Sequence, residues 1–245
     1  KVMEWKARYD PVRREFFEQQ EHVHPYVFMR TLSQKMGPDD IFVADCGGNI
    51  VVANHAFETK WGQRYITNNG NSPMGFSMCG AIGAWLADPS RRVVCVIGDG
   101  GMNVNLQELA TIARLGVNIK ILILNNHCYG ITVAYQKTNF EGRTEACTPE
   151  TGYAPPDFVD VADAYKIAAL YLDSMSDVST TLDDVLNYNG PIVCDVDCGR
   201  HHEYNPKITG WNTPLEDADP KLDRDEFRAN LIGIEPLPGW EKGEY

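Results

Sequence analysis

The sequence predicts an α/β domain, in which a parallel β-sheet carries helices on both faces, followed by an extended tail. The first observation is that short apolar runs alternate along the chain with longer segments of helical spacing. The second is that VVCVI (93–97) and IKILILN (119–125) place apolar residues on both faces of a strand, as in a sheet buried under helices on each side. The third is that glycines, Asp and Asn follow these runs, where parallel sheets form their ligand crevices.

The predicted elements begin after a polar and aromatic arm over residues 1–25. Pro25 suits the first turn of a helix that runs to about Met36, and Gly37-Pro38 ends it. The remaining elements, in chain order, are a strand at 41–48, a helix at 75–87, a strand and turn at 91–101, a helix at 105–116, a strand at 118–126, a helix at 158–165, a strand at 167–172, a helix near 177–189 and a strand at 191–198.

The last segment, residues 199–245, differs in composition from the rest of the chain. It is rich in Pro, Asp and Glu and contains no clear strand. We therefore expect three parts: an N-terminal arm at 1–25, a core domain at 26–198 and an extended acidic tail at 199–245.

Charge and cysteine content limit the partners and the compartment. The chain has 34 acidic and 22 basic residues and a formal net charge of -12, which argues against a nucleic-acid or anionic-membrane surface. Seven cysteines form no CxxC pair or zinc spacing, and this odd, scattered set favours a reducing compartment. We expect a cytoplasmic protein without a signal peptide, because no apolar run is long enough to span a membrane.

Two strand ends carry residues suited to chemistry. Gly98-Asp99-Gly100-Gly101 follows one apolar run, and Asn125-Asn126 follows the next. Adjacent parallel strands joined by one helix bring their carboxyl ends side by side, so Asp99 and Asn126 should meet although 27 residues separate them. A carboxylate, an amide oxygen and a free backbone carbonyl suit Mg²⁺, which completes its shell with phosphate and water oxygens. Either motif alone would be an ordinary turn.

The spacing of GDG and NN resembles the diphosphate-binding motif of thiamine diphosphate enzymes. The segments NSPMGFSMCGAIGAWLA and GDGGMNVNLQELATIARLGVNIKILILNNHCYGIT resemble the corresponding parts of acetolactate synthase and its relatives. The resemblance covers roughly residues 30–200 and concerns the C-terminal, diphosphate-binding domain of those enzymes. It implies the thiamine diphosphate-binding fold, with thiamine diphosphate and Mg²⁺ as cofactors.

The resemblance also implies roles for individual residues. Asp99 and Asn126 would hold the metal with their side chains, and Cys128 with its backbone carbonyl. Met74 would prop thiamine in its bent shape, and Ile131 and Tyr135 would line the substrate pocket. The residues that would contact the cofactor are Gly47, Gly48, Asn49, Met74, Gly98, Asp99, Gly100, Gly101, Asn126, Cys128, Tyr129, Gly130 and Ile131.

Several of these residues have simpler interpretations. Asn49 could cap the next helix, and Met74 could be an ordinary core residue. A catalytic thiol at Cys128 has no assigned base. The pair His201-His202 follows the last strand and could serve acid-base chemistry, but loop histidines are more often solvated, and their role stays open. We expect the arm histidines His22 and His24 to be structural.

The family requires a glutamate that activates the pyrimidine ring of the cofactor, and this residue lies in a separate pyrimidine-binding domain. Nothing in the sequence resembles that domain, and Glu15, Glu18 and Glu21 in the arm are poor candidates. We therefore expect a separate chain to supply it, in a hetero-oligomer with two copies of each chain. The resemblance implies decarboxylation of a 2-keto acid such as pyruvate, with transfer or release of the aldehyde unit.

Four alternatives remain open at this point. The chain could be the thiamine-binding subunit of a 2-keto acid:ferredoxin oxidoreductase, although it has no cysteine cluster of its own. It could belong to a split 2-keto acid decarboxylase, or be a non-catalytic cofactor-binding subunit. A nicotinamide-binding domain is disfavoured because no GxGxxG follows the first strand.

Overall fold

The computed structural model describes residues 1–18, 21–200, 204–208 and 212–244. The chain divides into two compact units, Lys1–His202 and Glu203–Tyr245, which are described separately.

The first unit is built on a six-stranded sheet in which every pairing is parallel, as the sequence predicts. The strand order is β2-β1-β3-β4-β6-β5. The strands are β1 (Ile41–Ala44), β2 (Arg64–Ile66), β3 (Val93–Gly98), β4 (Ile119–Asn125), β5 (Ala168–Leu172) and β6 (Ile192–Asp197). The short edge strand β2 was not predicted, because three residues are too few for a pattern.

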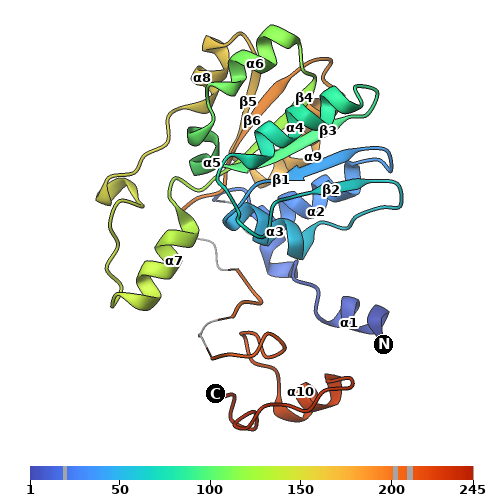
Figure 1. The fold of residues 1–245 in the computed structure, drawn as a ribbon, viewed down its shortest axis with the longest axis vertical. Helices are drawn as coiled ribbons and strands as arrows, with labels where there is room; N and C mark the ends of the chain where they lie inside the picture. The colour runs from blue at the N-terminus through green and yellow to red at the C-terminus, as the bar shows by residue number, and fades with distance from the viewer. Residues whose placement is uncertain (19–20, 201–203, 209–211, 245) are drawn as a thin grey trace. The chain divides into compact units, whose positions relative to one another are not determined.

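Helices cover both faces of this sheet (Figure 1). On one face, residues of β3, β4 and β6 form a single buried cluster with residues of α4 (Phe76–Ala87), α6 (Glu108–Leu115) and α8 (Phe158–Ala164). Helix α2 (Pro25–Lys35) packs against α3 (Gly48–Ala56) and α9 (Val178–Asn187) on the opposite side. The prediction of a parallel sheet between two helical layers is confirmed.

Local sequence explains where several helices begin and end. His24 caps α2 by accepting the Tyr26 N–H, and Pro25 occupies the first turn. Asp157 caps α8 by accepting two backbone N–H groups. Gly116, with φ of +63°, ends α6 in the left-handed conformation that glycine adopts without strain.

Three helices at the carboxyl edge of the sheet were not predicted. They are α3, α5 (Asp99–Val104) and α7 (Gly130–Asn139), and each begins within five residues of the end of a strand. Their sequences (GNIVVANHA, DGGMNV and GITVAYQKTN) combine glycine with β-branched residues and lack a helical apolar stripe. Packing against the sheet, rather than intrinsic propensity, accounts for the formation of α3 and α5. Helix α7 instead buries Val133 in a small cluster with Cys128 and Cys147.

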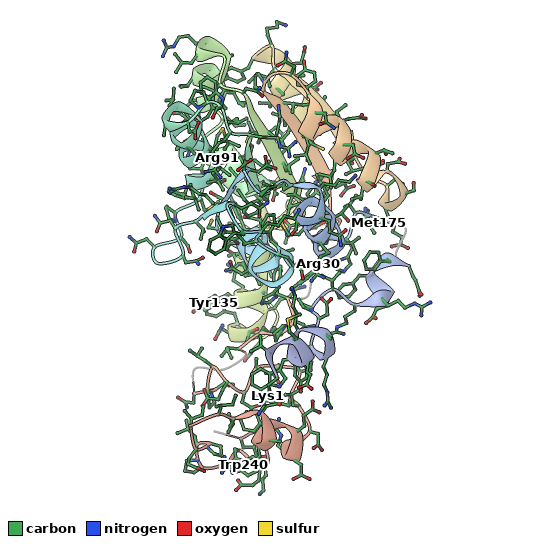
Figure 2. All side chains as sticks on the ribbon, turned by 90° about the vertical axis from the view of Figure 1, so that its right-hand side faces the viewer. Lys1, Arg30, Arg91, Tyr135, Met175 and Trp240 are labelled. Atoms are coloured by element: carbon green, nitrogen blue, oxygen red, sulfur yellow. The ribbon has the colours of Figure 1, made fainter. Side chains whose placement is uncertain are left out.

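The N-terminal arm contains α1 (Val2–Arg8) and a 3-10 turn, η1 (Arg14–Phe17). Arg30 of α2, labelled in Figure 2, holds the arm through two hydrogen bonds to Asp10, of 2.9 and 3.2 Å. The Arg30 Nε also donates to the carbonyl of Ala56 at the end of α3. Two further 3-10 turns are η2 (Pro149–Thr151) and η3 (Met175–Asp177).

The second unit contains helix α10 (Arg224–Asn230), which the sequence analysis did not predict within its extended tail. Asp223 caps this helix, and the buried carboxylate of Asp217 pairs with Arg224 at 2.9 Å. Phe227 packs near Trp240, with ring centroids 6.1 Å apart. In the described part of the chain, no helix is long and apolar enough to cross a membrane.

Candidate metal and diphosphate site

The carboxyl ends of β1, β3 and β4 meet at one edge of the sheet. β3 pairs with β1 through Val96 and Ala44, and with β4 through Gly98 and Leu124. The loops that follow these strands are consequently neighbours. A Cβ placed on Gly47 would lie 3.8 Å from the Ile131 side chain, and one on Gly98 would lie 3.4 Å from Asn49.

Asp99, Asn126 and Cys128 converge at this edge, as the motif spacing predicts. One polar atom of the half-buried Asn126 amide lies 2.8 Å from the Cys128 carbonyl oxygen and 3.1 Å from Oδ1 of Asp99. Both neighbours are hydrogen-bond acceptors. Two chemical arrangements satisfy this geometry: the amide nitrogen occupies the position and donates to both oxygens, or the amide oxygen occupies it and a cation binds all three.

The dimensions of this group fit Mg²⁺. Ligands at right angles around Mg²⁺, each 2.0–2.1 Å from the ion, lie about 2.9 Å apart. The two distances from the Asn126 amide, 2.8 and 3.1 Å, bracket this value. The group combines one carboxylate, one amide and one backbone carbonyl, and Mg²⁺ accepts a mixed set of this kind.

Asp99 is almost fully buried, with 2% of its surface exposed. Burial raises the pKa of its carboxyl to about 6, and a hydrogen bond from the Tyr153 hydroxyl to Oδ2, of 2.9 Å, opposes this shift. A buried carboxylate of this kind favours a bound cation, because the cation stabilises the negative charge that water would otherwise stabilise.

The glycines after β3 are required by close neighbours. A Cβ on Gly100 would lie 2.5 Å from the Tyr129 ring and 3.1 Å from Cε of Met74, and one on Gly101 would overlap the Asp45 carboxylate. Gly47, the residue directly before α3, has φ of +68°. Gly100 and Gly101 thus let the segment after β3 pack closely against Tyr129, Met74 and Asp45.

The predicted contact residues differ in what their side chains do. Asn49 donates to the Cys46 carbonyl and accepts the Asp45 N–H, so its amide closes the turn after β1. The Cys128 thiol is buried, and burial raises its pKa to about 12, which leaves it protonated. Met74, Ile131 and Tyr135 are 39%, 41% and 51% exposed, and Figure 2 labels Tyr135 on α7.

Two residues of the site were not singled out from the sequence. The buried Asp45 accepts the N–H groups of Gly75 and Ser77, at 3.1 and 2.9 Å, and so joins the end of β1 to the start of α4. Tyr153 bonds Asp99 from a loop 54 residues further along the chain. Only the place of Asp45, directly after a strand, could have suggested its role.

The histidines have structural partners where they are described. His127 has φ of +55°, and its Nε2 lies 3.1 Å from Oδ1 of Asp197. His22 lies 3.5 Å from the other oxygen of the same carboxylate, and His24 caps α2. His201 and His202 lie outside the described residues.

Comparison with known proteins adds the family. Residues 45–196 match the model of the thiamine pyrophosphate enzyme C-terminal TPP binding domain. An acetolactate synthase of Arthrospira platensis is 32% identical over 171 residues, which cover 70% of this chain and 29% of that protein. A probable acetolactate synthase large subunit of Methanococcus aeolicus is 34% identical over 155 residues, 63% of this chain and 25% of its own length.

The acetolactate synthase isozyme 2 large subunit of Escherichia coli K12 is 29% identical over 198 residues, 79% of this chain and 35% of that protein. The chain thus spans about a quarter to a third of the length of these relatives. The cofactors of this domain are thiamine diphosphate (thiamine pyrophosphate) and Mg²⁺. The match to residues 45–196 covers more than half of the sequence, and the chain belongs to the thiamine pyrophosphate enzyme family through its C-terminal cofactor-binding domain.

Proposed function

We propose that this chain binds thiamine diphosphate with Mg²⁺ as the diphosphate-binding part of an acetolactate synthase-like enzyme. The enzyme decarboxylates a 2-keto acid such as pyruvate and transfers or releases the resulting aldehyde unit. The observation that carries the proposal is the convergence of the Asp99 carboxylate, the Asn126 amide and the Cys128 carbonyl at the edge where β3 and β4 end.

The residues around these ligands fit a diphosphate. Helices α3 and α7 begin beside each other, as the proximity of Gly47 to Ile131 shows, and the N–H groups and partial positive charge of a helix N-terminus favour phosphate. The backbone segments that would face the diphosphate are Gly47–Asn49, Gly98–Gly101 and Tyr129–Ile131. Two positive charges on the metal would also offset the negative charge of the diphosphate.

The chain's other contributions are steric. Met74 lies against Gly100 and is held in place by Gly75, whose N–H donates to Asp45, so it can support the thiamine ring from one side. Ile131 and Tyr135, exposed on α7, would line the substrate pocket. When bound, thiamine diphosphate supplies the electron sink for loss of CO₂, while these residues orient it and exclude water.

The activating glutamate is expected on a pyrimidine-binding domain. Glu15, Glu18 and Glu21 are exposed on the arm. We propose a separate chain as the source, in an assembly with two copies of each. The relatives from Methanococcus aeolicus and Escherichia coli are named as large subunits, and this chain covers 25% and 35% of their lengths.

Calorimetric titration of the 245-residue chain with thiamine diphosphate, with and without Mg²⁺, tests the ligand assignment. Binding should depend on Mg²⁺, and Asp99→Ala or Asn126→Ala should abolish the metal-dependent part. Asp184→Ala, on the exposed side of α9, is the matched control and should bind as the wild type does. Unchanged binding by Asp99→Ala would refute the assignment.

The partner is tested by turnover. The chain alone should release no CO₂ from pyruvate, and addition of a pyrimidine-domain chain recovered by pull-down should restore release that depends on Mg²⁺ and thiamine diphosphate. Full activity of the isolated chain would contradict the need for a partner. The products separate the alternatives: acetolactate indicates carboligation, free aldehyde a decarboxylase, and reduction of ferredoxin an oxidoreductase.

A further inference from the structure

Asp99 divides its two oxygens between two different neighbours. Oδ1 lies 3.1 Å from the Asn126 amide, on the side of the proposed metal ligands. Oδ2 accepts a hydrogen bond of 2.9 Å from the Tyr153 hydroxyl. Tyr153 is 7% exposed, so water does not compete freely for this contact.

Tyr153 belongs to a loop, residues 146–153, that also contacts the turn after β4. The Cys147 carbonyl accepts the Tyr129 N–H at 2.9 Å, one residue beyond Cys128. The Tyr129 and Tyr153 rings lie with centroids 4.0 Å apart. This loop therefore touches both segments that supply the proposed ligands, the one after β3 and the one after β4.

The loop has its own internal bonds, which fix the direction of Tyr153. Thr148 and Thr151 form a reciprocal capping box around η2, and the Ala146 N–H donates to the Thr151 carbonyl at 2.9 Å. Gly152, with φ of +113°, turns the chain so that the Tyr153 N–H donates to Thr148. A hydroxyl on a ring held in this way presents a fixed donor rather than a mobile one.

We propose that Tyr153 is a positioning residue that restricts Asp99 to binding the metal through Oδ1 alone. The proposal rests on the proposed metal site. A carboxylate whose second oxygen accepts a hydrogen bond from a buried hydroxyl must bend or break that bond before it can turn both oxygens toward one ion. Mg²⁺ requires near-octahedral geometry with single-oxygen contacts, whereas Ca²⁺ takes more oxygens and accepts a carboxylate through both. Tyr153 thus favours Mg²⁺ over Ca²⁺ at this site.

The test compares two metals on the same protein. Binding of thiamine diphosphate to the 245-residue chain is titrated in saturating Mg²⁺ and in saturating Ca²⁺, for the wild type, Tyr153→Phe and Tyr65→Phe. Tyr153→Phe keeps the ring and removes only the hydroxyl. Tyr65→Phe is the matched control, because it removes a hydroxyl that bonds Asn54, a residue outside the ligand group.

We expect Tyr153→Phe to weaken Mg²⁺-dependent binding by about 10- to 100-fold, the usual effect of removing a residue that orients a metal ligand. Ca²⁺-dependent binding should fall by less, so the preference for Mg²⁺ shrinks, while Tyr65→Phe leaves both unchanged. An equal loss for both metals, or no loss, would overturn the proposal.

Two comparisons separate the role of Tyr153 from a loss of folding and from a failure of the proposed metal site. If Tyr153→Phe lowers the folded fraction, the ratio of the two affinities still reports the site, because both are measured on the same folded molecules. If the wild type shows no Mg²⁺-dependent binding, or Asp99→Ala retains it, the proposed function fails rather than the role of Tyr153.

Discussion

Replacing Gly101 by alanine should destabilise the domain, although Gly101 lies in a helix. In an unconstrained helix interior, glycine to alanine stabilises by about 1 kcal/mol. At Gly101 the added Cβ would overlap the Asp45 carboxylate and lie 3.1 Å from Cγ1 of Ile97. The structure therefore predicts that steric conflict reverses the sign of the propensity effect.

The magnitude follows from what Asp45 holds. Its carboxylate is buried and accepts the N–H groups of Gly75 and Ser77, so it cannot move aside without breaking a buried hydrogen bond. Overpacking costs about 1–3 kcal/mol, and a buried N–H left without a partner costs about 1–3 kcal/mol. After the helix-propensity gain of about 1 kcal/mol, the net loss should be about 3 kcal/mol, within a range of about 1–5.

Urea unfolding followed by far-UV circular dichroism measures this loss. Gly83→Ala is the matched control, since Gly83 lies exposed in α4 with no atom within 4 Å of an added Cβ. Gly83→Ala should raise the free energy of unfolding by up to about 1 kcal/mol. The two substitutions are the same chemical change with opposite expected signs. Equal or greater stability of Gly101→Ala relative to the wild type would refute the reasoning.

Two further predictions concern pH. Burial lowers the pKa of His24 from 6.5 to about 4, so the unfolded chain takes up this proton first, and stability falls as pH drops from 6.5 toward 4. Allowing for the partial exposure of His24, the free energy of unfolding should fall by about 2 kcal/mol over this range. His24→Asn keeps an acceptor for the Tyr26 N–H but has no group that titrates there. Urea unfolding of this variant should therefore lack this part of the pH dependence. Burial raises the pKa of Asp195 from 3.8 to about 6, and its Oδ1 has no hydrogen-bond partner, so stability is lost as pH rises through 6. Asp195→Asn should therefore be more stable than the wild type by about 2 kcal/mol near pH 8 and equal to it near pH 4. Equal stability of the two proteins at both pH values would contradict a raised pKa of Asp195.

The centre of the sheet could be predicted from sequence because its constraints are local. The runs at β3 and β4 are continuous and apolar, one helix joins them, and the handedness of such a unit leaves one arrangement. Asp99 and Asn126 are fixed by where those strands end, so their proximity follows from the same pattern. The 3.1 Å between the Asn126 amide and Oδ1 of Asp99 confirms that proximity.

The surroundings of the site could not be predicted, for physical reasons. Helix α3 forms from a sequence of low helix propensity because the sheet supports it, and β2 is too short to show a period. Asp45 and Tyr153 act on groups 30 and 54 residues away, at Gly75 and Asp99. Such contacts between loops form only when the sheet has assembled, so the spacing of residues in a single sequence does not reveal them.

The amide of Asn126 has a consequence for how the domain behaves as metal comes and goes. Its oxygen and nitrogen occupy nearly the same volume, and rotation by half a turn exchanges a ligand for a donor. Without a cation, the nitrogen can donate to both Asp99 and the Cys128 carbonyl, so repulsion among oxygens does not force the loops apart. Metal entry then exchanges two hydrogen bonds, worth about 1 kcal/mol each, for coordination. The metal-free domain is therefore expected to keep the shape of its loaded form, with one rotated side chain as the main difference.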